Sequence, residues 1–201
     1  MLKTLADTGR YDPVWRAAEP YMRARKNDVH IPLSFAWAQR LLDEYSEADR
    51  DVVSLAILLH DIGWFSIDME DIIEKGFSGA NMLQSDVRYL HESEGIRLAK
   101  PVLRDAGWSD DVIAQVCEII DGHDTRPDPR HLNDRLVRDA DKLWRFDVTG
   151  IAVASDWFKT TPHGYADRLE RQKDKLETDA GCVWAGETLA ASRVALMLHV
   201  I

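Results

Sequence analysis

The sequence feature that most constrains the fold is an apolar run that ends in an adjacent histidine and aspartate. Residues 52–59 read Val-Val-Ser-Leu-Ala-Ile-Leu-Leu, and His60-Asp61-Ile62-Gly63 follows directly. Because the run is apolar on nearly all sides, it predicts a helix buried in the middle of a bundle. An imidazole and a carboxylate in its buried last turn would cost on the order of several kcal/mol without partners. A metal ion would remove that cost.

The glycine that follows this pair is expected to end the helix. Gly63 stands just past the last apolar residues. This is the position at which a left-handed backbone conformation is common, because glycine has no Cβ. The sequence therefore predicts that the chain turns away at Gly63 and leaves His60 and Asp61 at the helix end.

Three other histidines lie at or beside the ends of apolar helical patterns. A helix is predicted to begin near His30, His91 lies beside the apolar face of a helix over 85–106, and His123 follows a helix that Ser109 caps. Four independent buried histidines would each need a partner of their own, whereas one or two metal ions satisfy them together. Convergence on metal is therefore the simpler hypothesis. The other histidines fall in loops or the tail and are expected to lie outside the site: His131, His163 and His199.

The rest of the chain also carries helical patterns. Asp12 is predicted to cap a first helix, and Asn133 to cap one in which Asp141 falls between apolar positions. Further helices are expected over three C-terminal stretches: 148–159, 165–177 and 188–201. No run alternates between apolar and polar residues as strands do, so the predicted fold class is an all-α helical bundle.

The segment between the third helix and the helix over 85–106 has a different character. It holds Gly76, Gly79 and several polar residues. Such composition is typical of a loop. We expect this loop to cover one end of the bundle, as a candidate lid.

Length and charge restrict the class of protein. The 201 residues fit one domain, 1–201, with a core that needs no disulfides. The formal charge is −10 and the basic residues are scattered, which argues against nucleic acid as a partner. No stretch is long enough to cross a membrane, and the N-terminal apolar run is too short for a signal peptide. A cytoplasmic location is therefore predicted. In that reducing compartment Cys117 and Cys182, which form no CxxC pair, are expected to be buried apolar fillers.

The order of these residues resembles a known family. His30, His60-Asp61, His91 and His123 are followed by Asp141 within Arg-Asp-Ala-Asp-Lys-Leu, and Leu-Leu and Ile-Gly flank the His-Asp pair. In this the chain is similar to compact bacterial members of the HD-domain superfamily of metal-dependent phosphohydrolases. The resemblance covers roughly residues 25 to 150. It leaves 151–201 as a C-terminal helical extension.

The resemblance implies a ligand set for two metal ions. The first ion would be held by four residues: His30, His60, Asp61 and Asp141. His91 and His123 would hold the second, with Asp61 bridging. Asp141, not Asp139, matches the Ala-Asp-Lys-Leu frame. Imidazoles and carboxylates without thiolate suit manganese, iron, cobalt, nickel or zinc, and magnesium is less favoured by so many nitrogens. For a site with two metals, iron or manganese is expected.

The resemblance also implies an activity. The protein is expected to hydrolyse a small phosphate ester, such as a nucleotide, by attack of metal-bound hydroxide on phosphorus. Asp61 and Lys142 are the predicted catalytic residues, and Lys142 would be a second cation on the phosphate unless it is a solvated surface lysine. Arg145 and Lys26 are weaker candidates for that role. Three aromatic residues could line an apolar part of the pocket: Trp64, Phe65 and Trp144.

Two other functions fit part of the same pattern. A di-iron HD-domain oxygenase that cleaves a C–P or C–C bond would use the same ligands, but the short interval from His123 to Asp141 is more similar to the hydrolases. A non-catalytic HD sensor of nucleotides would be expected to lack a ligand, and none is missing. The expected partner is thus a small phosphorylated substrate, without nucleic acid or membrane, and homodimer formation is left open.

Overall fold

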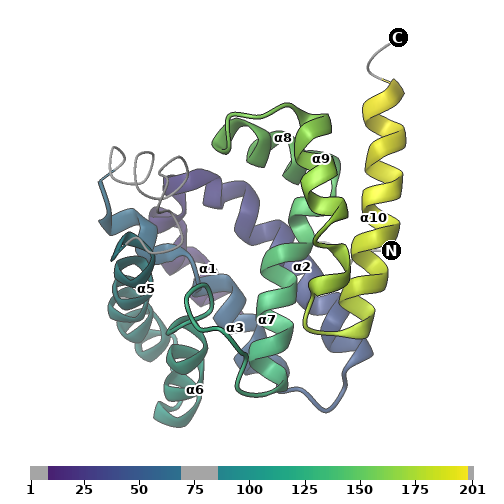
Figure 1. Cartoon of the computed structure of the whole chain (residues 1–201). Helices are drawn as coiled ribbons and strands as arrows, with labels where there is room; N and C mark the ends of the chain where they lie inside the picture. Colours follow the sequence, from purple (N-terminus) through teal and green to yellow (C-terminus); the bar gives the residue numbers. More distant parts are fainter. Residues whose placement is uncertain (1–8, 69–85, 199–201) are drawn as a thin grey trace.

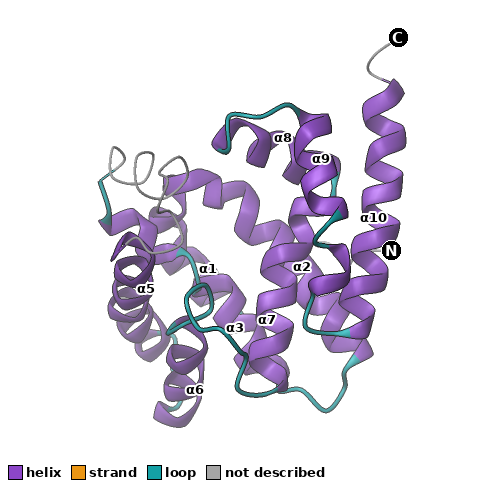
Figure 2. Cartoon of the chain, viewed as in Figure 1, coloured by secondary structure: helices purple, strands orange, loops and turns teal. Residues whose placement is uncertain are grey.

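The computed structural model describes residues 9–68 and 86–198, which form helices and loops with no strand among them (Figures 1 and 2). The all-α prediction is therefore confirmed. The α-helices are α1 (Asp12–Ala18), α2 (Asn27–Glu44), α3 (Arg50–Leu59), α5 (Asp86–Asp105), α6 (Asp110–Ile120), α7 (Leu132–Leu143), α8 (Val148–Trp157), α9 (Pro162–Glu170) and α10 (Asp179–Leu198). Short 3-10 helices join them: η2 (Glu19–Lys26), η3 (Ile62–Ser66), η6 (Trp144–Phe146) and η7 (Lys173–Lys175).

The helix that precedes the His-Asp pair, α3, is the centre of the bundle. Residues 52–59 are all fully buried. The Asp49 side chain caps the helix by accepting hydrogen bonds from the backbone N–H of Asp51 at 2.9 Å and of Val52 at 3.1 Å. Helices α2, α6 and α7 pack against α3. The apolar run thus places His60 and Asp61 at the end of a helix that is enclosed by its neighbours.

The other helices lie on two sides of this centre. Helices α5 and α6 lie on one side, and α9 and α10 lie on the opposite side, next to α7 (Figure 1). Helix α8 packs on η6 and α9. The C-terminal extension is therefore packed against the part of the chain that resembles the HD superfamily. None of the described helices combines the length and the apolar character that crossing a bilayer requires.

The structure corrects two predicted helix caps. Asp12 is the first residue of α1, and Tyr11 occupies the N-cap position without a side-chain hydrogen bond. Asn133 lies inside α7, and His131 is the N-cap, whose Nδ1 accepts from the backbone N–H of Asp134 at 3.3 Å. The Asn133 side chain instead accepts from the backbone N–H of Asp49 at 2.9 Å, which ties α7 to the start of α3.

Several predicted boundaries also move. Helix α2 begins at Asn27, so His30 lies inside its first turn, and α10 begins at Asp179, well before the predicted start at 188. The stretch predicted as one helix over 165–177 is α9 followed by η7. The candidate lid lies outside the described residues. Cys117 is buried, but Cys182 on α10 is partly exposed, which corrects the prediction that both are buried.

Gly63 is required by packing and not by a left-handed backbone. The glycines with positive φ among the described residues are Gly107 and Gly122. A Cβ on Gly63 would lie 1.9 Å from the carbonyl oxygen of His91 and 2.4 Å from the backbone nitrogen of Gly95. Gly63 therefore lets η3 pack closely against the backbone of α5 at His91 and Gly95.

The C-terminal extension is held to α7 by a buried carboxylate. Asp139 accepts from the backbone N–H of Glu177 at 2.7 Å, from the backbone N–H of Thr178 at 2.9 Å and from Thr178 Oγ1 at 2.7 Å. Burial raises the pKa of Asp139, while the hydrogen bonds from Thr178 oppose that shift. Asp139 therefore has a structural role, which distinguishes it from the candidate metal ligand Asp141.

Asp139→Ala is expected to lower the free energy of unfolding by about 3 kcal/mol, because it leaves buried donors of Glu177 and Thr178 unpaired. Denaturant unfolding monitored by circular dichroism measures the change. The matched control is Glu177→Ala, which removes the partly exposed ion pairs with Arg138 and Lys142 but keeps the backbone donor. It should cost about 1 kcal/mol or less. Equal losses for the two variants would contradict this role.

Candidate metal centre

Six histidine and aspartate residues from five helices meet at one end of the bundle. Each is at most 6 % exposed. They lie on or directly after α2, α3, α5, α6 and α7: His30, His60, Asp61, His91, His123 and Asp141. These are the residues that the sequence order singles out as candidate ligands. The structure brings them together in space.

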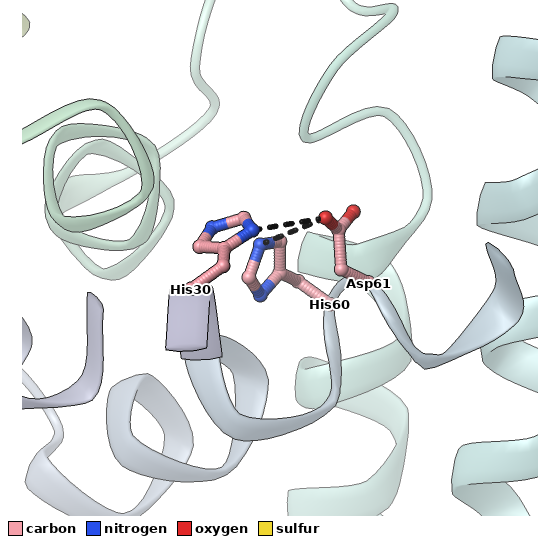
Figure 3. Close-up of side chains that lie close together, drawn as sticks. All are labelled: His30, His60 and Asp61. Atoms are coloured by element: carbon pink, nitrogen blue, oxygen red, sulfur yellow. Dashed lines mark ion pairs between the residues drawn. The ribbon is translucent and has the colours of Figure 1, made fainter. Parts of the chain in front are cut away.

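Asp61 stands between two groups of imidazoles. Its Oδ2 lies 3.3 Å from His30 Nδ1 and 3.8 Å from His60 Nε2, as the dashed lines of Figure 3 mark. Its Oδ1 lies 3.5 Å from His123 Nε2 and 3.6 Å from His91 Nε2. One carboxylate thus faces a histidine pair with each of its oxygens.

The two groups have the spacing of metal ligands. His91 Nε2 and His123 Nε2 are 3.4 Å apart. With Asp61 Oδ1 they form a nearly equilateral triangle, and ligand atoms about 2.1 Å from a shared ion lie about 3.0–3.5 Å from each other. His30, His60 and Asp61 form a second, wider group, in which the ligand atoms lie within 4.8 Å of one another.

Asp141 joins the group that contains His30 and His60. Its Oδ1 lies 2.8 Å from His30 Nε2 and 3.4 Å from His60 Nε2. Asp139, two residues earlier, faces Thr178 instead. The structure therefore places Asp141, and not Asp139, beside the histidines.

Two of the histidines are oriented by backbone carbonyls of their own helices. His60 Nδ1 lies 2.7 Å from the Ile57 carbonyl oxygen, and His123 Nδ1 lies 2.9 Å from that of Ile120. A carbonyl only accepts hydrogen bonds, so Nδ1 carries the proton in both rings. Each Nε2 lone pair then points into the cluster, as metal-ligating histidines require.

Several polar atoms of the cluster fit a bound cation. Within the part of the chain that the structure describes, both ring nitrogens of His30, His60 Nε2 and Asp141 Oδ1 are buried and make no hydrogen bond of good angular geometry, although His30 Nε2 and Asp141 Oδ1 are 2.8 Å apart. Each such atom costs free energy unless it is bonded. A divalent ion would satisfy His60 Nε2, Asp141 Oδ1 and one nitrogen of His30, whose other nitrogen carries the proton. The residues present therefore fit the metal that the predicted ligand set implies.

The cluster also shifts the pKa values of its members. Burial would raise the pKa of Asp61, but the imidazoles around it, first of all His60, hold it well below its usual value. Burial and the neighbouring His123 lower the pKa of His91 to about 3. Burial opposes the charge on His123, yet the hydrogen bond with Asp61 raises the pKa of His123 to about 10. Protons and metal ions would therefore compete for the same lone pairs.

Two tryptophans that the sequence suggested as pocket lining hold the ligands in place. Trp64 Nε1 donates to Asp61 Oδ1 at 2.9 Å, and its ring stacks on His91 with the centroids 4.2 Å apart. The Trp144 ring stacks on His30 at 4.7 Å. Phe65, the third aromatic residue, is 49 % exposed.

Two residues that position the site were not predicted from the sequence. Asn27 donates from Nδ2 to the Asp61 carbonyl oxygen at 2.9 Å. The buried Glu92 accepts from the backbone N–H groups of Asp124 and Thr125 at 2.9 and 3.0 Å, and so fixes the loop that carries His123. Neither residue stands in a motif, since both act on backbone atoms of a distant segment.

The positively charged side chains beside the cluster are two arginines, whereas the sequence favoured Lys142 for that position. Lys142 Nζ pairs with Glu177 Oε1 at 3.3 Å, and its side chain is 39 % exposed. An Arg145 guanidinium nitrogen lies 3.4 Å from Asp141 Oδ2, and one of Arg25 lies 3.7 Å from Asp61 Oδ2. A catalytic role for Lys142 stays a prediction, while both arginines are in place beside the carboxylates.

The fold and this cluster define an all-helical protein with a histidine and aspartate centre for divalent metal. The HD domain family model matches residues 30–145, which is more than half of the chain. The protein belongs to the HD domain family. Searches of curated proteins and of solved structures gave no match.

Proposed function

We propose that the protein is a metal-dependent phosphohydrolase that acts on small phosphate esters. The observation that carries this proposal is Asp61, whose two carboxylate oxygens face separate histidine pairs at 3.3–3.8 Å. This arrangement suits two adjacent divalent ions. Such ions supply a water that is ionised at neutral pH and a Lewis acid for phosphoryl oxygens.

The residues of the chain have distinct parts in this proposal. His30, His60 and Asp141 would hold one ion, His91 and His123 the other, and Asp61 would serve both. Trp64 fixes the Asp61 carboxylate through its indole N–H. The buried tryptophan rings on His91 and His30 exclude bulk water from the ligands, which strengthens electrostatic interactions with a bound anion.

The proposed substrates are small because the charge of the chain disfavours large polyanions. The formal charge is −10, so long-range attraction of a nucleic acid backbone is not expected. A small phosphate ester needs only a local positive charge, which bound metal ions and the two nearby arginines would provide. Iron and manganese are the proposed metals, given the mixed nitrogen and oxygen donors.

Removal of metal is expected to abolish hydrolysis of a chromogenic phosphate monoester or diester, because the proposed nucleophile is water ionised by the metal and the histidines and aspartates of the cluster are the proposed ligands. Protein purified without chelator is assayed before and after dialysis against a chelator, and again after addition of Fe(II) or Mn(II). Activity should return with metal content, measured by elemental analysis.

Two results would contradict the proposal. Hydrolysis that survives complete removal of metal would rule out this chemistry. Oxygen consumption by the loaded protein with a phosphonate or a polyol, without release of phosphate from any ester, would favour the oxygenase instead.

A further inference from the structure

Arg25 occupies an unusual backbone conformation next to the cluster. The φ angles of Arg25 and Lys26 are +50° and +56°, in the left-handed region, although neither residue is glycine. Residues with a Cβ are strained there, and such strain gathers at binding and catalytic sites. The turn that these two residues make ends η2 and begins α2, and it directs the Arg25 side chain toward Asp61.

The Arg25 guanidinium is held between two indole rings. Its central carbon lies 4.0 Å from the Trp64 ring centroid and 5.2 Å from that of Trp157, and the side chain is 8 % exposed. Cation–π contacts of this kind fix the plane of the guanidinium. Trp157 ends α8 in the C-terminal extension. Both Arg25 and Trp157 therefore lie outside residues 30–145, which match the family.

Arg145 provides a second guanidinium in the same region. It lies beside Asp141, as Arg25 lies beside Asp61. The two guanidiniums therefore flank the carboxylates of the cluster, Arg25 at 3.7 Å from Asp61 Oδ2 and Arg145 at 3.4 Å from Asp141 Oδ2. An anion bound near both would meet two positive charges.

We propose that Arg25, clamped between Trp64 and Trp157, binds and orients the phosphoryl group of the substrate beside Asp61, with Arg145 as its counterpart beside Asp141. The inference rests on the proposed function and adds the residues that recognise the anion. A planar guanidinium can donate two parallel hydrogen bonds to phosphoryl oxygens, which a lysine cannot do. The C-terminal extension takes part in recognition through Trp157.

The test is the binding of inorganic phosphate to the metal-loaded protein, measured by titration calorimetry. Arg25→Gln is expected to raise the Kd about tenfold or more, because charge-assisted hydrogen bonds are lost. Arg25→Lys keeps the charge but loses the planar fork, and should raise the Kd severalfold. Metal content and unfolding midpoint are measured for each variant, so that loss of phosphate binding is compared at equal metal loading.

The chain offers a matched control in Arg40. Its guanidinium lies 3.9 Å from the Trp184 ring centroid and 5.2 Å from that of Trp37, so it has the same kind of contacts on another face. Arg40→Gln should leave the Kd for phosphate within about twofold of the wild-type value. An equal loss of binding in Arg40→Gln would overturn the inference.

Other outcomes separate this inference from the proposed function. If the wild type hydrolyses phosphate esters but Arg25→Gln and Arg25→Lys bind phosphate as the wild type does, the role of Arg25 is wrong and the phosphohydrolase proposal stands. If Arg25→Gln does not fold, Arg25→Lys alone decides, and an unchanged Kd overturns the inference. If the loaded wild type hydrolyses no ester, the proposed function fails, whatever the phosphate titrations give.

Discussion

Asp61→Ala is expected to remove both metal ions and to lower phosphatase activity by about a thousandfold or more. The reason is geometric, because each oxygen of Asp61 faces a different pair of histidines. The other aspartate of the cluster, Asp141, lies within 4 Å of His30 and His60, which form one of the two pairs. Elemental analysis of the purified variant and a chromogenic phosphatase assay measure the two effects.

The control for this prediction is a variant of a candidate ligand that contacts only one of the two oxygens of Asp61. His91→Ala should lose one ion and keep the other, since His91 contacts the Oδ1 side of Asp61 and lies beside His123. The stoichiometry of metal then distinguishes the variants. An Asp61→Ala protein that retains both ions would disprove the bridging role.

Gly63→Ala is expected to lower the free energy of unfolding by about 3 kcal/mol or more. The added Cβ would meet backbone atoms of His91 and Gly95, at 1.9 and 2.4 Å, which no change of rotamer can relieve. To avoid this clash, η3 and α5 must separate. His91 would then move away from Asp61, so the variant should also bind less metal. Denaturant unfolding and metal analysis measure both changes.

Gly107→Ala is the control that distinguishes the effect of a steric clash from the effect of a left-handed backbone conformation. Gly107 has a φ of +83°, and nothing lies within 4 Å of the position of an added Cβ. This variant should cost only about 1–2 kcal/mol, from the left-handed backbone, and should leave metal binding intact. A Gly63→Ala protein as stable as the wild type would mean that the close approach of η3 and α5 is not needed.

The C-terminal helices contribute to both stability and recognition. Asp139 ties α7 to the segment before α10, and Trp157 reaches Arg25 from α8. The family match ends at residue 145, so these contacts are additions of this chain to the matched region. Loss of the extension would remove the contact of Trp157 with the Arg25 guanidinium.

The sequence alone determined the class of fold and the identity of the candidate ligands. An apolar run over 52–59 that only Ser54 interrupts predicts a buried helix, and the helical period of apolar residues elsewhere favours helices over strands. The order of His30, His60-Asp61, His91, His123 and Asp141 carries the family resemblance, because ligand chemistry depends on residue type. Both properties depend on residue type and on order along the chain, so they can be read without the tertiary structure.

The tertiary structure decided which side chains face the cluster and why certain residues are needed. Gly63 serves a contact with α5, the cap of α7 is His131, and Arg25 lies 3.7 Å from Asp61 Oδ2 whereas Lys142 pairs with Glu177. None of this follows from spacing along the chain. The direction of a side chain, and the backbone that it meets, depend on how distant helices pack, and packing is a property of the whole fold.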